Sequence, residues 1–155
     1  MVGDRIREGN MEPIGKCHFL VLEDNEDESF LIKRAFAKAR SSATAFLCRN
    51  ISEAKSYLNG SGIYSCAKSF PKPQAIISDL HLNGEDGFEL LSWTQEKAEL
   101  RKIPFIVLTG SANPVELLRA RSLGAAKVIP KPSTLPELTQ IIETLSQEWC
   151  HVLAY

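Results

Sequence analysis

The stretch Ala75-Ile76-Ile77-Ser78-Asp79 joins a short apolar run to a carboxylate. Such a run predicts a buried β-strand, which places Asp79 at the carboxyl end of that strand. Three further runs end in the same way: Phe19-Leu20-Val21-Leu22 precedes Glu23-Asp24, Phe105-Ile106-Val107-Leu108 precedes Thr109-Gly110, and Val128-Ile129-Pro130 precedes Lys131-Pro132. If the strands are parallel, their carboxyl ends meet at one edge of a sheet, where open α/β sheets bind ligands.

The side chains at that edge carry complementary charges. Two carboxylates about 4 Å apart repel each other by about 4 kcal/mol at an effective dielectric constant of about 20, so they need a cation between them. Mg²⁺ binds one or two carboxylates together with a phosphoryl group. A lysine ammonium binds phosphate as a compact charge, and a threonine hydroxyl donates a hydrogen bond to a phosphoryl oxygen. The pattern therefore indicates a site that accepts a phosphoryl group.

The order of these residues resembles the receiver domain of two-component response regulators. The resemblance covers residues 16–149 and includes the acidic pair after the first strand, Asp79, Thr109-Gly110 and Lys131-Pro132. It implies that Asp79 is the phosphoacceptor and that Lys131 and Thr109 contact the incoming phosphoryl group. It also implies a site for Mg²⁺ or Mn²⁺ whose ligands are Glu23, Asp24, Asp79 and the backbone carbonyl of His81.

The same resemblance implies a reaction with a partner. The phosphoryl group would come from the phosphohistidine of a histidine kinase or phosphotransfer protein, and catalysis would be mostly positioning and charge neutralisation. The chain would catalyse only its own phosphorylation and dephosphorylation and would not be an enzyme for another substrate. His81 and Ser111, two residues after Asp79 and Thr109, occupy positions that in similar domains adjust the access of water to the phosphoryl group.

Two positions depart from the family pattern. Asn83 stands where similar proteins commonly have proline, and Val128 stands where many have an aromatic residue that reorients with the threonine. We expect the first change to leave the chemistry intact. The second should alter the output step, because valine cannot act as a switching ring.

The alternation of strand and helix signals predicts an α/β fold of the (βα)5 type. It indicates one doubly wound, five-stranded parallel sheet in the flavodoxin-like order 2-1-3-4-5. We expect a tail over 1–15, a receiver domain over 16–149 and a second tail over 150–155. Helices are expected from about 26 to 40, 52 to 58, 86 to 100 and 113 to 124 and after Thr134, with a long surface loop over 59–73. In the first of these helices, Phe30, Leu31 and Ala35 are expected to face inward.

The composition fits one ordinary globular domain. The 155 residues are 44% hydrophobic and carry a formal net charge of -1, which argues against a nucleic-acid surface. No apolar run approaches the ~20 residues that span a bilayer, so we expect no membrane segment. The cysteines form no C-x-x-C pair and follow no signal peptide, so neither a zinc site nor a disulfide framework is indicated. We expect reduced thiols in the cytoplasm for Cys17, Cys48, Cys66 and Cys150.

The receiver pattern fills nearly the whole chain, so we expect the signal to leave through surface contacts. The last helix carries apolar residues at 3-4-3-4 spacing and is followed by an apolar tail that includes Val152, Leu153 and Tyr155. We therefore expect a homodimer through the fourth helix, fifth strand and fifth helix, with the tail and Trp149 contributing. The long loop before the third strand and the late tryptophan also resemble the small single-domain regulators of phytochrome-type histidine kinases.

Three other classes of protein compete with this interpretation. A pseudo-receiver would bind partners without phosphorylation, although the complete set of site residues disfavours it. A small phosphoryl-transfer enzyme on the same fold, such as an aspartate-nucleophile phosphatase, would usually carry a second acid where this chain has His81. A flavin carrier is disfavoured because no phosphate-binding loop rich in Ser, Thr and Gly follows the first strand.

Overall fold

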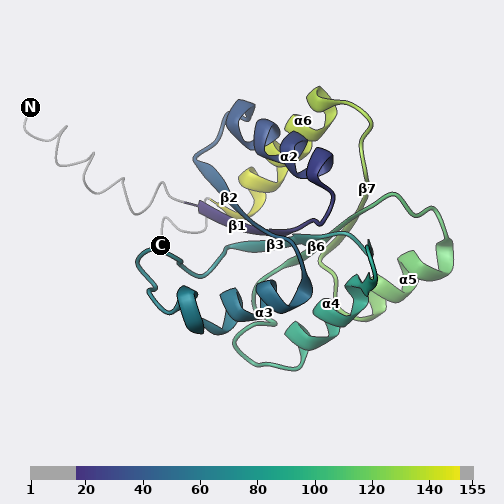
Figure 1. The fold of residues 1–155 in the computed structure, drawn as a ribbon. Helices are drawn as coiled ribbons and strands as arrows, with labels where there is room; N and C mark the ends of the chain where they lie inside the picture. The colour runs from purple at the N-terminus through teal and green to yellow at the C-terminus, as the bar shows by residue number, and fades with distance from the viewer. Residues whose placement is uncertain (1–16, 151–155) are drawn as a thin grey trace, which may run out of the picture.

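The computed structural model describes residues 17–150, which form a parallel β-sheet covered by helices on both faces (Figure 1). The sheet contains β1 (Cys17–Leu22), β2 (Ala43–Cys48), β3 (Ala75–Ser78), β6 (Phe105–Thr109) and β7 (Lys127–Pro130). The order is β2-β1-β3-β6-β7, and every neighbouring pair is parallel. These are the five expected strands in the flavodoxin-like order, so the predicted fold class is confirmed.

The helices form two layers. One face of the sheet carries α2 (Glu26–Lys38) and α6 (Leu135–Trp149), and the other carries α3 (Ile51–Asn59), α4 (Gly87–Gln95) and α5 (Pro114–Ser122) (Figure 1). Short elements complete the chain: the 3₁₀ turn η1 (Gly62–Tyr64) and the antiparallel pair β4 (His81–Leu82) and β5 (Glu85–Asp86). Each α-helix begins at a side chain that accepts a hydrogen bond from the first turn, namely Asn25, Asn50, Asp86, Asn113 and Thr134.

The sheet separates two hydrophobic cores, because alternate residues of each strand face opposite sides. In β1, Leu20 and Leu22 belong to the core beneath α3 and α4, whereas Phe19 and Val21 belong to the core beneath α2 and α6. All four residues of β3 are buried, as expected for a central strand covered on both faces. Because both faces of the sheet are packed, the strands hold the loops at its carboxyl edge in fixed positions.

The inward face of α2 differs from the sequence prediction. Ala35 is buried as expected, but the side chains of Phe30 and Leu31 are exposed, at 59% and 42%. The core is filled instead by Ile32 and Phe36, which lie four positions apart and share one face of the helix with Ala35. Hydrophobicity alone did not fix the rotation of the helix, and the assignment of Phe30 and Leu31 was wrong.

The segment between α3 and β3 is held by a cluster of four aromatic rings. Phe46, Tyr57, Tyr64 and Phe70 have ring centroids 4.8–6.0 Å apart. The Tyr57 hydroxyl also donates a hydrogen bond of 2.8 Å to the carbonyl oxygen of Pro71. The long insertion is therefore packed onto the domain. The helix expected over 86–100 is shorter than predicted, since α4 ends at Gln95 and turns lead from there to the buried Leu100.

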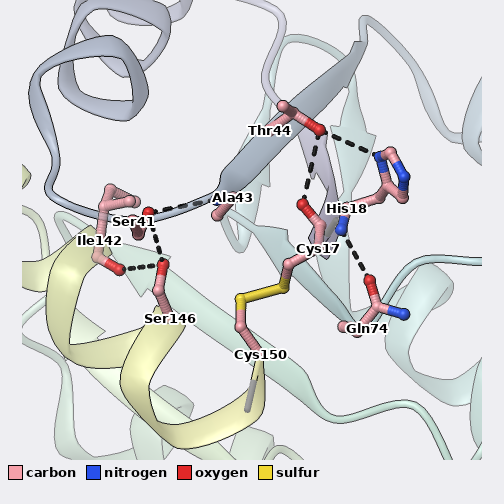
Figure 2. Close-up of a disulfide and its surroundings, with 9 residues drawn as sticks. All are labelled: Cys17, His18, Ser41, Ala43, Thr44, Gln74, Ile142, Ser146 and Cys150. Carbon is pink, nitrogen blue, oxygen red and sulfur yellow. Dashed lines mark hydrogen bonds between the residues drawn. A yellow bond between two sulfur atoms is a disulfide. The ribbon is translucent and has the colours of Figure 1, made fainter. Parts of the chain in front are cut away.

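A disulfide joins the start of the sheet to the end of the last helix (Figure 2). Cys17 and Cys150 are bonded, with their Cα atoms 5.4 Å apart and a sequence separation of 133. The expectation of reduced thiols was wrong for these two residues, whereas Cys48 and Cys66 are free. Spacing along the chain could not reveal the pair, because the tertiary packing of α6 beside β1 brings the two cysteines together.

Further contacts fix the end of α6. The Ser146 hydroxyl donates to the carbonyl oxygen of Ile142 at 2.7 Å and lies 3.3 Å from the Ser41 hydroxyl (Figure 2). The Trp149 ring packs against the core beneath α2 and α6, and the ammonium of Lys127 lies 5.9 Å from its centroid. Trp149 is thus partly engaged within its own domain. The tail residues Val152, Leu153 and Tyr155 lie outside the described residues.

Candidate functional site

Four of the expected site residues converge at the carboxyl edge of the sheet. Glu23 directly follows β1, Asp79 follows β3, Thr109 ends β6 and Lys131 follows β7. The strand register places these residues at the same height along the strand direction, since Leu22 pairs with Ser78 and Thr109 pairs with Pro130. Glu23, Asp79 and Thr109 are buried, and the Lys131 side chain is 21% exposed.

The Lys131 ammonium forms the centre of the site. Its Nζ lies 2.8 Å from Oδ2 of Asp79 and 3.3 Å from Oε1 of Glu23. It also contacts Oε1 of Glu28, in the first turn of α2. One ammonium therefore contacts three carboxylates, which leaves excess negative charge at the site.

Glu28 is a site residue that the sequence analysis missed. It belongs to the acidic run Glu26-Asp27-Glu28, which stabilises the positive end of the helix dipole and so has an ordinary local explanation. The signal that could have found it is helical spacing. The cap at Asn25 begins the helix beside Glu23, and the third residue after that cap points back to the edge of the sheet.

Burial and charge shift the titration of the groups around Lys131. Burial raises the pKa of Glu23 to about 7, against the opposing effect of the Lys131 charge. Burial alone would lower the pKa of the Lys131 ammonium, but hydrogen bonds with Asp79 and Glu28 outweigh it, so that this pKa is raised. The site therefore holds a charged lysine beside a glutamate that keeps its proton to a higher pH than an ordinary carboxyl group does.

The donor set fits a hard divalent cation. One carboxylate oxygen from each of Glu23, Glu28 and Asp79 lies within 4.8 Å of the other two. Carboxylate oxygens are the ligands that Mg²⁺ and Mn²⁺ prefer. Of the expected ligands, this group contains Glu23 and Asp79 and lacks Asp24.

Asp24 is engaged by the loop that follows Asp79. Its Oδ2 accepts a hydrogen bond from the backbone N–H of Asn83. Proline has no backbone N–H, so this contact depends on the departure from the family pattern at position 83. The substitution thus links the two acidic loops of the site.

The loop after β3 is shaped by close contact with the start of α4. Oδ1 of Asp79 accepts hydrogen bonds from the backbone N–H groups of Leu80, at 2.6 Å, and His81, at 3.3 Å. A Cβ atom on Gly87 would lie 2.1 Å from the carbonyl oxygen of Asp79, so only glycine fits there. Asp86 caps α4, as its position before Gly87 indicated.

The loop after β6 is connected to the loop after β3 through side chains. Ser111 donates its backbone N–H to Oγ1 of Thr109 at 3.1 Å, and its hydroxyl to Oε1 of Glu116 at 2.5 Å. Nε2 of His81 lies 3.0 Å from the same Glu116 oxygen. The hydrogen bond to Glu116 raises the pKa of His81, and the one from Ser111 lowers the pKa of Glu116.

Comparison with known proteins agrees with this geometry. The family model described as the response regulator receiver domain matches residues 19–143. Response regulator Rcp1 of Synechocystis sp. is 25% identical over 130 residues, covering 84% of this chain and 86% of Rcp1. The phosphorylated cyanobacterial phytochrome response regulator RcpA is 29% identical, with a TM-score of 0.76 over 86% of this chain and 94% of its own.

A third comparison concerns the fold. The Mn²⁺-bound form of Rcp1 superposes with a TM-score of 0.72 and 24% identity, over 84% of this chain and 92% of its own. These matches do not favour the pseudo-receiver or the phosphoryl-transfer enzyme. None of the helices between residues 17 and 150 has the length and hydrophobicity needed to cross a bilayer.

Proposed function

The chain belongs to the response regulator receiver family, which signals by phosphorylation, and from this we infer that Asp79 is its phosphoacceptor. The observation that carries the proposal is the 2.8 Å contact between Oδ2 of Asp79 and Nζ of Lys131. It puts an ammonium next to a nucleophilic oxygen on a buried carboxylate at the edge of the sheet.

The reaction that we propose is phosphoryl transfer from the phosphohistidine of a histidine kinase or phosphotransfer protein. An oxygen of Asp79 attacks phosphorus, the P–N bond to the histidine breaks, and the departing imidazole keeps its electron pair and takes up a proton. Lys131 leaves one carboxylate partner to pair with a phosphoryl oxygen, and the Thr109 hydroxyl donates to another. Oγ1 of Thr109 accepts a hydrogen bond from the backbone N–H of Ser111, so the hydroxyl hydrogen of Thr109 remains to be donated to the phosphoryl group.

The site also fits the divalent cation used by this family, Mg²⁺ or Mn²⁺, with Glu23, Asp24, Asp79 and the backbone carbonyl of His81 as the proposed ligands. The cation supplies positive charge that offsets the charge of the incoming phosphoryl group. Glu28 then serves as the alternative partner of Lys131. Asp24 would hold the cation from the loop after β1, where its Oδ2 accepts a hydrogen bond from the backbone N–H of Asn83.

The output that we propose is a change of contacts on the face formed by α5, β7 and α6. Val115 and Leu118 of α5 expose 73% and 64% of their surface, and this exposed apolar pair on a helix of that face supports a homodimer. Val128 in β7 lacks the ring that commonly couples this face to the hydroxyl, so we expect the dimer to depend weakly on phosphorylation. We further propose a cytoplasmic location, no activity on another substrate, and no binding to nucleic acid or membrane.

Phosphorylation by acetyl phosphate and Mg²⁺ tests the proposal directly. Intact mass should show one added phosphoryl group on the parent and none on Asp79→Asn, which keeps the shape of the side chain and removes its charge. Asp27→Asn is the matched control, because Asp27 is an exposed acid of the first turn of α2 and should label like the parent. Equal labelling of Asp79→Asn and the parent would refute the assignment.

A further inference from the structure

Glu116 connects the two loops that flank the proposed phosphoacceptor. Its Oε1 accepts from the Ser111 hydroxyl at 2.5 Å and lies 3.0 Å from Nε2 of His81. Glu116 belongs to the first turn of α5, whereas His81 belongs to β4 and precedes it by 35 positions. The contact therefore joins two segments that the local chain does not connect.

Hydrogen bonds continue from this contact to both reactive side chains. The backbone N–H of His81 donates to Oδ1 of Asp79 at 3.3 Å. On the other side, the backbone N–H of Ser111 donates to Oγ1 of Thr109 at 3.1 Å. A continuous path thus runs from the phosphoacceptor to the hydroxyl donor, with Glu116 at its midpoint.

The exposure of the two side chains shows which one depends on the other. The His81 side chain is 60% exposed, whereas that of Glu116 is 27% exposed and is also held by Ser111. An exposed imidazole without an anchored partner samples several rotamers. Glu116 therefore fixes the ring beside Asp79 and fixes the Ser111 hydroxyl opposite it.

We propose that Glu116 is a positioning residue that holds His81 and Ser111 together over phosphorylated Asp79 and slows the attack of water. This inference rests on the proposed function, because it concerns the lifetime of the phosphorylated state. In that hydrolysis a water oxygen attacks phosphorus and the P–O bond to Asp79 breaks. The products are the Asp79 carboxylate, inorganic phosphate and a proton. The contacts of Glu116 with His81 and Ser111, called the bridge below, act before this step by filling the approach to the phosphorus atom.

The test is the decay of the phosphorylated protein after removal of acetyl phosphate, followed by intact mass. Glu116→Ala and His81→Ala should each decay about twofold to fivefold faster than the parent, the range expected for one partly exposed charged contact. The double variant should decay no faster than either single variant, since both changes break the same bridge. Glu116→Gln keeps an acceptor oxygen and should stay close to the parent.

Glu137→Ala separates the bridge from a general effect on helix ends. Glu137 lies in the first turn of α6 and accepts from the backbone N–H of Ser133 at 3.2 Å, so it matches Glu116 except for the link to the site. Its decay should equal that of the parent. A second readout needs no phosphate: His81→Ala should shift the amide NMR signal of Ser111 in the parent background and leave it unmoved in Glu116→Ala.

The outcomes separate the two proposals. A parent that takes up no phosphoryl group would refute the proposed function and the lifetime role with it. A labelled parent whose decay is unchanged or slower in Glu116→Ala would overturn the bridge alone. Independent effects, in which the double variant decays at the product of the two single accelerations, would also overturn it.

Discussion

Breaking the disulfide between Cys17 and Cys150 should lower the free energy of unfolding by several kcal/mol. The bond closes a loop that spans 133 positions of the chain. In the chain-entropy account, such a loop removes about 17 cal/mol/K from the unfolded ensemble, which is about 5 kcal/mol at 25 °C. Ordinary domains unfold with about 5–15 kcal/mol, so the reduced protein should lose a large part of its stability.

Urea unfolding with and without a phosphine reductant measures this loss. For an m-value of about 2 kcal/mol per M, the urea midpoint should fall by about 2.5 M on reduction, and the melting temperature by about 10–20 °C. Cys150→Ser should behave like the reduced parent and should not respond to the reductant. Cys66→Ser is the control, because the Cys66 thiol is free and exposed.

Thiol titration in denaturant shows how to interpret urea midpoints that do not change on reduction. The unreduced chain should show two thiols and the reduced chain four, since Cys48 and Cys66 are free and the sequence has four cysteines. Four thiols before reduction would show that the bond does not form. Two thiols before reduction with equal urea midpoints would refute the loop-closure argument, because the bond would then exist without stabilising the fold.

Four further measurements test the site and the surface. Asp24→Asn should weaken Mg²⁺ binding about tenfold or more in a fluorescence titration, with Asp27→Asn unchanged; equal affinity would make Asp24 a turn residue only. Gly87→Ala should lower the free energy of unfolding in urea by about 2–4 kcal/mol, because its Cβ would lie 2.1 Å from the Asp79 carbonyl oxygen. Gly110→Ala is the control and should leave that free energy unchanged, because a Cβ at this position meets nothing within 4 Å. The folded pKa of Glu23, about 7 against an ordinary 4.5, means that the folded protein keeps a proton which the unfolded chain has lost. Its contribution to the unfolding free energy should therefore fall by at most about 3 kcal/mol as pH rises from about 4.5 to 7, and this slope should vanish in Glu23→Gln. Leu118→Lys should reduce any dimer seen by sedimentation at tens of micromolar, whereas Ile63→Lys, at an exposed apolar residue of η1, should not. A parent that is monomeric with and without phosphorylation contradicts the dimer.

The parts of the molecule that sequence predicted well are those that a short pattern determines. An apolar run followed by a polar residue fixes where a strand ends, and parallel strands bring those ends to one edge. Glu23, Asp79, Thr109 and Lys131 were therefore placed together before any contact was known. Their proposed roles depend on the family resemblance and on the variants described above.

The missed features all depend on contacts between distant segments. The face of α2 was misassigned because Phe30 and Leu31 are apolar but exposed. Glu28 and Glu116 each lie in the first turn of a helix, where an acid is favourable without any function. The pairing of Cys17 with Cys150 joins residues that are 133 positions apart in the sequence. In each case a local rule already accounted for the residue type at that position, so nothing in the local sequence pointed to the distant contact.

The disulfide also determines how the domain carries mechanical load. The chain enters the sheet at Cys17 and leaves α6 at Cys150, so the entry and exit points of the folded part are bonded to each other. A pulling force applied through these two residues passes through the S–S bond and does not stretch the sheet or the helices. The entry point lies at the amino end of β1, about 20 Å along a strand of six residues from the edge that carries Asp79. Tension on the ends of the chain should therefore leave the geometry around Asp79 undisturbed while the bond is intact.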